Sequence, residues 1–176
     1  MNKKFIAFSV LFCALFISCE DLTEVNENPN GVQPELVNPN LVLPTVLTEA
    51  AKAFVNLGYQ DIAGVVQLTQ KDAWSSGHND YDWGGSQDWG GYYGILRNNQ
   101  LVYDRAVELD YEFHQGVALV MKSLMFGLIT DLWGDAPYST ALKGELGGGE
   151  NIKPAYDSQE DIYTGILADL ETANTL

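Results

Sequence analysis

Apolar residues follow a helical spacing along most of the chain after its first forty residues. They recur at three- and four-residue steps over residues 44–72, 92–110 and 114–132, which is the period of one face of a helix. We expect a fourth helix to begin at Asp157 or Ser158, because acidic residues stand three positions later, as in a capping box. No segment of any length alternates between apolar and polar residues. The pattern therefore predicts an all-α fold.

The apolar positions also predict which face of each helix is buried. In the first segment these are Leu47, Ala50, Ala51, Phe54, Leu57, Gly58, Ile62, Val65 and Val66, with a break expected at Gly58 or Gly64. In the second they are Tyr92, Ile95, Leu96, Val102, Tyr103 and Ala106; in the third, Val117, Val120, Met121, Leu124, Leu128 and Leu132; in the fourth, Ile162, Ile166, Leu170 and Ala173. Neighbouring helices with short connections favour antiparallel pairs. Pairs stacked side by side would form a solenoid, although no fixed-period sequence repeat is visible.

The N-terminus has the pattern of a secretory signal. Lys3 and Lys4 precede an apolar run over residues 5–17, which is shorter than the roughly 20 residues that span a bilayer. Phe16-Ile17-Ser18-Cys19 resembles a bacterial lipobox, in which the cysteine becomes the lipidated first residue of the mature protein. The alternative is an ordinary exported protein with a stray cysteine. Because Cys13 lies inside the signal, no thiol remains in the mature body for a disulfide or a metal.

Three regions follow from these patterns: a lipoprotein signal peptide over residues 1–18, a lipid-anchored tether over 19–42 and a helical body over 43–176. The tether is rich in Asn, Pro and Glu and contains a turn sequence at Asn28-Pro29-Asn30-Gly31. No glycine or proline stop signal follows the last helix before Leu176. We therefore expect the chain to be the front part of a longer protein.

The charge of the chain restricts its partners. The formal net charge is −15, and removal of the signal would make the mature part more acidic. Such a surface repels nucleic acid and anionic lipid, both of which attract basic patches. A neutral ligand or a protein partner fits it better, although solubility alone accounts for most of the acidity.

A Gly-rich stretch between Trp74 and Tyr93 is the candidate ligand site. Its tryptophan and tyrosine rings could stack on the apolar faces of sugars, and amide and carboxylate groups could bind the hydroxyls. The tentative ligand residues are Trp83, Tyr81, Trp74, Asn79, Asp80 and Asp82. The alternatives are packing of the rings against the core or a partner, and ordinary turn chemistry for the polar residues. Trp89 and Tyr93 are expected at the start of a helix, packed inward.

Catalysis and metal binding have little support in the sequence. Asp80, Asp82 and Asp88 are interspersed with glycines, a composition similar to that of a calcium-binding loop. The EF-hand spacing and its closing Glu are absent. Gly84-Gly85 and Gly90-Gly91 lack the preceding strand and the following Lys of a phosphate loop. His78 and His114 stand alone, and close carboxylate pairs arise by chance among 24 acidic residues. We expect no enzyme activity, no cofactor and no metal.

The end of the third predicted helix carries a family motif. The helix runs into Thr130-Asp131-Leu132-Trp133-Gly134-Asp135-Ala136-Pro137-Tyr138-Ser139, where Gly134 can take a left-handed cap and Pro137 prevents continuation. Asp131 to Tyr138 resembles a run in the SusD/RagB family of outer-membrane nutrient-binding lipoproteins. Three further segments resemble the family in the same order: the lipobox with its following acids, residues 26–30, and residues 156–173. The resemblance covers only the family's N-terminal portion.

This resemblance implies a tetratricopeptide-like scaffold of helix pairs, in which Asp131, Trp133, Gly134, Asp135, Pro137 and Tyr138 are structural. It implies a protein on the outer face of the outer membrane that captures an oligosaccharide or other nutrient. The protein would pass that ligand to a TonB-dependent SusC-like transporter. The alternative is a helical-repeat adaptor in the outer membrane whose only partners are proteins.

Overall fold

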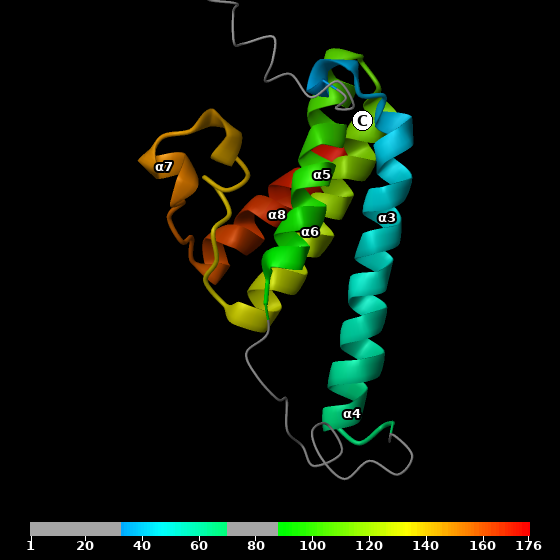
Figure 1. Ribbon diagram of the computed structural model, residues 1–176, viewed down its shortest axis with the longest axis vertical. Helices are drawn as coiled ribbons and strands as arrows, with labels where there is room; N and C mark the ends of the chain where they lie inside the picture. The colour runs from blue at the N-terminus through cyan, green and yellow to red at the C-terminus, as the bar shows by residue number, and fades with distance from the viewer. Residues whose placement is uncertain (1–32, 70–87) are drawn as a thin grey trace, which may run out of the picture. The chain divides into compact units, whose positions relative to one another are not determined.

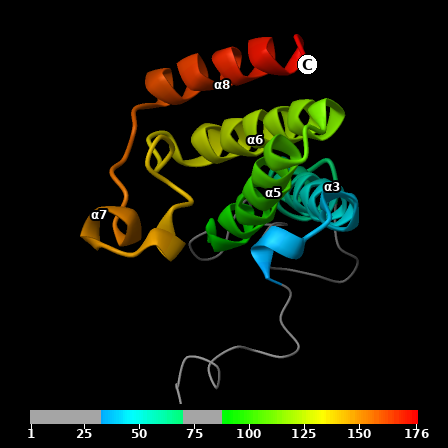
Figure 2. The same cartoon turned by 90° about the horizontal axis from the view of Figure 1, so that it is seen from above.

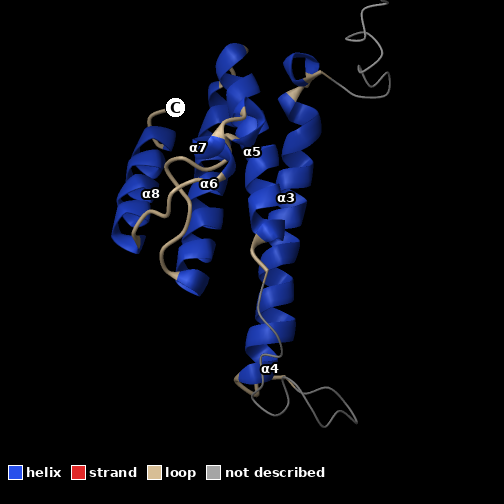
Figure 3. Cartoon of the chain, turned by 60° about the vertical axis from the view of Figure 1, so that its left-hand side comes forward, coloured by secondary structure: helices blue, strands red, loops and turns tan. Residues whose placement is uncertain are grey.

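The fold is that of a computed structural model, which describes residues 33–69 and 88–176. This part of the chain contains helices and one isolated antiparallel bridge, between Ala136 and Asp157, and no strand (Figure 3). The elements are η1 (Pro34–Leu36), α3 (Pro39–Asn56), η2 (Leu57–Ile62), α4 (Ala63–Val65), α5 (Gly90–Glu108), α6 (Glu112–Trp133), η4 (Gly144–Leu146), α7 (Gly149–Ile152) and α8 (Gln159–Ala173). The predicted all-α fold is confirmed.

The first long helix, α3, begins five residues before its predicted start at Pro44. Asn38 caps it by accepting a hydrogen bond from the backbone N–H of Asn40 at 3.0 Å, and Pro39 occupies the first turn, where a missing N–H costs nothing. Arg105 donates a hydrogen bond to the Val37 carbonyl at 3.1 Å, which ties η1 to α5. The folded body therefore begins ahead of residue 43.

The break predicted at Gly58 or Gly64 takes the form of a π-helical turn. Residues Leu57–Ile62 form the wider helix η2, and α4 continues from Ala63 to Val65. Such insertions interrupt the regular hydrogen bonds of an α-helix without ending it. The helical segment then ends near Gln67, a non-glycine residue with a φ of 59°.

The four long helices pack in the order of the sequence. α3 packs on α5, α5 on α6, and α6 on α8, as Figures 1 and 2 show. The core between them is formed by Leu43, Val46, Ala50, Ile95, Leu96, Val102, Ala118, Met121, Met125, Phe126, Ile129, Ala136, Ile162 and Ile166. Burial of these side chains is the main force that holds the helices together.

Three predicted faces differ from the observed ones, and in α8 the difference is Leu170, which is 38% exposed. In α6, Val120, Leu124 and Leu132 are exposed, whereas Leu119, Met125, Phe126 and Ile129 are buried. The physical reason is that α6 lies between α5 and α8, so it is apolar on two sides and a single stripe does not describe it. In α3 and its continuation, the predicted core residues Leu47, Phe54, Ile62 and Val66 are exposed. Leu43 and Val46 of α3 belong to the core instead. The faces of α5 and the start of α8 were predicted correctly.

Among the described residues, two helical stretches, Pro39–Val65 and Glu112–Trp133, have the length and hydropathy of a membrane span. The second is α6, the central helix of the stack, and its apolar residues pack against α5 and α8. Packing against α5 and α8 accounts for the buried apolar residues of α6, whereas Val120, Leu124 and Leu132 are exposed.

Candidate functional site

A tight turn ends α6 at the family motif. The Thr130 hydroxyl donates to the carbonyl of Gly134 at 2.7 Å, and the Gly134 N–H returns a bond to the Thr130 carbonyl at 2.8 Å. Gly134 has φ 76° and ψ −123°, values of the first central residue of a type II′ turn. The φ is positive as expected, but ψ excludes the left-handed helical cap that the sequence predicted. A glycine is required here because side chains disfavour this conformation.

Asp157 fixes the segment that follows this turn. Its carboxylate accepts hydrogen bonds from the backbone N–H groups of Tyr138 and Ser139, each at 2.9 Å, and from the Ser139 hydroxyl at 2.7 Å. Its backbone forms the bridge to Ala136. Burial raises the pKa of Asp157, but the three hydrogen bonds to its charged form outweigh burial and leave the pKa below its ordinary value.

The other acidic residues of the motif bind α8. The Asp135 carboxylate accepts from the N–H of Gln159, one of the unpaired donors in the first turn of that helix. Asp131 accepts from the Tyr163 hydroxyl at 2.6 Å, and the Gln159 side chain donates to the Thr130 carbonyl at 2.8 Å. The motif therefore joins the end of α6 to the start of α8.

Tyr138 packs between α6 and α8. Its ring meets Phe126 edge to face at a centroid distance of 4.7 Å, and its hydroxyl donates to Asp169, which is paired with Lys122. Burial, followed by the negative charge of Asp169 and the bond to it, raises the pKa of the Tyr138 hydroxyl well above its usual range. The hydroxyl is therefore a permanent donor.

Four aromatic residues from distant parts of the chain form what we call the aromatic cluster. They are Trp89, Tyr92, Trp133 and Tyr156. The Trp89 ring lies 5.8 Å from Trp133 and 5.9 Å from Tyr156, and Tyr92 lies 5.6 Å from Trp133, all between centroids. These are the distances of favourable aromatic contacts.

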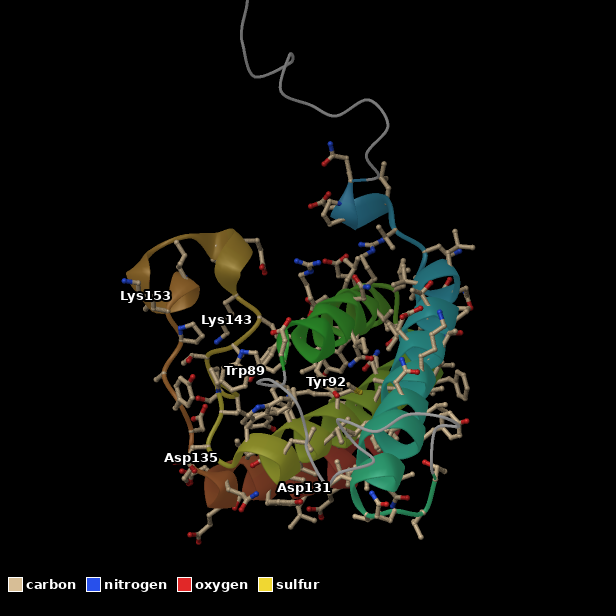
Figure 4. All side chains as sticks on the ribbon, turned by 60° about the horizontal axis from the view of Figure 1, so that its bottom comes forward. Trp89, Tyr92, Asp131, Asp135, Lys143 and Lys153 are labelled. Atoms are coloured by element: carbon tan, nitrogen blue, oxygen red, sulfur yellow. The ribbon has the colours of Figure 1, made fainter. Side chains whose placement is uncertain are left out.

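The aromatic cluster is partly open to solvent. Trp89, Tyr92 and Trp133 are half-buried, and Tyr156 is 62% exposed. Figure 4 shows Trp89 and Tyr92 at the start of α5, with Asp131 and Asp135 near the end of α6. Tyr93, the next residue after Tyr92, packs on Trp89, and its hydroxyl donates a hydrogen bond to the Pro137 carbonyl at 2.7 Å. This bond joins the start of α5, which carries two cluster residues, to the family motif. Half-buried rings held by a rigid frame can stack on a flat apolar ligand surface without losing rotamer freedom.

The sequence reasoning missed this arrangement. The sequence analysis predicts Tyr92 on a buried helix face and Trp133 as a structural residue of the motif, and it gives Tyr156 no ligand role. No local signal places residue 156 beside residue 89, because the contact depends on the turn after α6. Trp89 and Tyr93 do lie at the start of α5 and pack inward, as predicted.

The predicted ligand residues Trp83, Tyr81, Trp74, Asn79, Asp80 and Asp82 lie outside the described residues, as does Cys19. Asp88, the third acid of the calcium hypothesis, accepts a hydrogen bond from the Gly90 N–H at 2.8 Å and so helps to start α5. Within residues 33–69 and 88–176, His, Cys, Asp and Glu form no group of three that could hold a metal ion.

Comparison with known proteins assigns the chain to a family. A sequence model of the SusD-like family, described as starch-binding and associating with the outer membrane, matches residues 32–176. Two solved SusD homologues from Bacteroides fragilis resemble the structure at 26% sequence identity, one with a TM-score of 0.62 over 79% of this chain and one with 0.56 over 81%. The chain spans 28% of the length of each. Among curated proteins, none matches. The chain belongs to the SusD-like family.

Proposed function

We propose that this protein is a carbohydrate-binding component of the outer membrane that captures glycan with the aromatic cluster. The observation that carries this proposal is the convergence of Trp89, Tyr92, Trp133 and Tyr156 on one partly open face. The family description, starch-binding and associating with the outer membrane, supports the same class of ligand.

The chemistry of the aromatic cluster fits a sugar. A pyranose presents a flat face of C–H groups, which packs on an indole or phenol ring, and an edge of hydroxyls, which hydrogen-bonds to polar groups. Acidic side chains lie close by: Asp131 and Asp135 belong to the turn that carries Trp133, and Asp157 follows Tyr156. A net charge of −15 leaves a neutral ligand such as starch unaffected by long-range repulsion.

The proposal includes export and anchoring. The signal pattern before Cys19 supports lipidation at that residue, and the family's association with the outer membrane supports a lipid anchor there, with the body facing the cell exterior. In this role the bound glycan is passed to a TonB-dependent SusC-like transporter. No chemistry on the ligand is needed, so we do not propose an enzyme activity.

A second candidate is the adaptor role, with protein partners only. Exposed apolar side chains along α3 and its continuation favour the adaptor role. They are Leu47, Val55, Tyr59 and Ile62, which are 42%, 63%, 66% and 38% exposed. Exposed apolar stripes of this kind mark interaction surfaces.

Titration with oligosaccharides while recording tryptophan fluorescence separates the two candidates. Malto-oligosaccharides are the first probes, followed by a panel of β-linked oligosaccharides. Because Trp89 and Trp133 lie in the aromatic cluster, a bound sugar should change their emission in a saturable way. Lack of any response across the panel would reject glycan capture and favour the adaptor.

A further inference from the structure

A groove runs between α3 and α5 next to the aromatic cluster. Its volume is about 470 Å³, within the range of small-molecule sites, and it is lined by the second half of α3 and the first half of α5. Tyr92 forms part of its wall, and the ring of Tyr92 is also a member of the aromatic cluster through its 5.6 Å contact with Trp133. The groove and the aromatic cluster therefore share a residue.

The polar side chains of the groove are of the types that can hydrogen-bond to sugar hydroxyls. Asn56 approaches from α3, and Arg97 and Asn98 approach from α5. Within the described part of the chain, none of these three side chains has a hydrogen-bond or ion-pair partner. Amide and guanidinium groups supply donors, and the amides supply acceptors, so together they match vicinal hydroxyls. The other charges of the groove include the pair Lys52 and Glu49, which neutralise each other at 2.7 Å.

Two glycines of α5 keep the groove open. Gly91 and Gly94 both line it, and a Cβ placed on either would meet, among the described residues and outside its own helix backbone, no atom within 4 Å. A helix interior disfavours glycine by about 1 kcal/mol relative to alanine. Neither residue has a positive φ, so the turn geometry of the backbone does not require them. Their lack of a side chain leaves this wall of the groove low.

We propose that this groove holds a second sugar unit of the same glycan, next to the unit stacked on the aromatic cluster. The inference rests on the proposed function. It adds that the ligand is an oligosaccharide bound through at least two adjoining sugar units, with Tyr92 between them. The first unit is held by ring stacking. The second is held by hydrogen bonds from Asn56, Arg97 and Asn98.

The test fills the groove by changing a residue that does not belong to the aromatic cluster. Gly94→Leu places a side chain at a position where no atom of the described residues lies within 4 Å of the new Cβ, and a thermal unfolding curve checks that the fold is retained. Gly149→Leu, at the start of α7, is the matched control, because a Cβ there also meets nothing and Gly149 does not line the groove. Arg97→Ala is a second variant that removes a groove donor from an exposed side chain. Binding of maltose and of maltoheptaose is measured by calorimetry for each protein.

The wild type and Gly149→Leu should bind maltoheptaose more tightly than maltose. Gly94→Leu should weaken maltoheptaose binding by about tenfold or more, towards the maltose level. Arg97→Ala should also weaken the binding of maltoheptaose. Equal binding of maltoheptaose by Gly94→Leu and the wild type would overturn the groove inference and leave the proposed function standing. Absence of binding to the wild type would overturn both.

Discussion

Gly165 of α8 lies directly against Tyr138: a Cβ at residue 165 would be 2.4 Å from the Tyr138 hydroxyl oxygen and 2.6 Å from its ring. The ring cannot move aside freely, because Phe126 packs against it at a centroid distance of 4.7 Å and Asp169 accepts a hydrogen bond from its hydroxyl. We predict that Gly165→Ala lowers the free energy of unfolding by about 1–3 kcal/mol, the usual cost of overpacking. Urea denaturation measures this change in the free energy of unfolding.

Gly94→Ala is the control for that prediction. Both glycines lie inside helices, but a Cβ at residue 94 meets no atom within 4 Å. The alanine should therefore raise stability by up to about 1 kcal/mol through helix propensity alone. A stabilising effect of Gly165→Ala would show that Tyr138 does not occupy the place described.

The hydrogen bonds of Asp157 predict a stability that depends on pH. Because its pKa is lowered in the folded protein, the carboxylate's contribution is fully present above the unfolded pKa of about 3.9. It is lost as the pH falls from that value through the lowered folded pKa. Asp157→Asn should reduce stability at pH 7 by about 1–3 kcal/mol, since it removes a charged acceptor from three donors.

The measurement for Asp157 is the free energy of unfolding between pH 2 and pH 7 for the wild type and the variant. The difference between the two proteins should shrink as the pH falls below about 4. Glu171→Gln, an exposed acid on α8, provides the control for removal of one negative charge. A difference that stays constant over the whole range would contradict the role assigned to the carboxylate.

Gly134 should resist substitution. Its φ of 76° and ψ of −123° are unfavourable for any residue with a side chain, although a Cβ there would meet no atom within 4 Å. Backbone strain is then the whole effect, and Gly134→Ala should lower the free energy of unfolding by about 1–3 kcal/mol. Thermal or urea unfolding checks this. Stability equal to the wild type would mean that the backbone of the turn differs.

Lipidation at Cys19 can be tested in cells of an outer-membrane bacterium. Radiolabelled palmitate should be incorporated into the wild type and should be absent from Cys19→Ala. Protease added to intact cells should degrade the anchored protein if its body faces outward. Failure of the label to incorporate would reject the anchor, and protection from protease would reject the exterior location.

The helices were predictable because their signals are local. Ser158 was predicted as a candidate cap with an acid three residues later, and it does accept the N–H of Asp161 at 3.1 Å at the start of α8. The buried face of α6 was not predictable, because contact with α5 and α8 on two sides is a tertiary property. The apolar pattern did not predict the short helix α7, next to Gly147 and Gly148.

The candidate site was less predictable than the fold. Tryptophan content pointed to the stretch before residue 93, but the described aromatic cluster also draws on Trp133 and Tyr156. Their approach to Trp89 depends on the turn at Gly134 and the three bonds of Asp157, whose partners are far apart in sequence. The spacing of apolar residues along the sequence does not indicate a contact between residues this far apart.

The central claim is that the aromatic cluster binds glycan, and Tyr156 tests it most directly. Tyr156→Ala removes a ring that is 62% exposed, and Tyr59→Ala removes one that is 66% exposed on η2, outside the cluster. Calorimetric titration with maltoheptaose should give weaker binding for Tyr156→Ala, by about 1–3 kcal/mol, the usual cost of removing a stacked aromatic ring. Tyr59→Ala should bind like the wild type. Equal affinity of the wild type and Tyr156→Ala would contradict the claim.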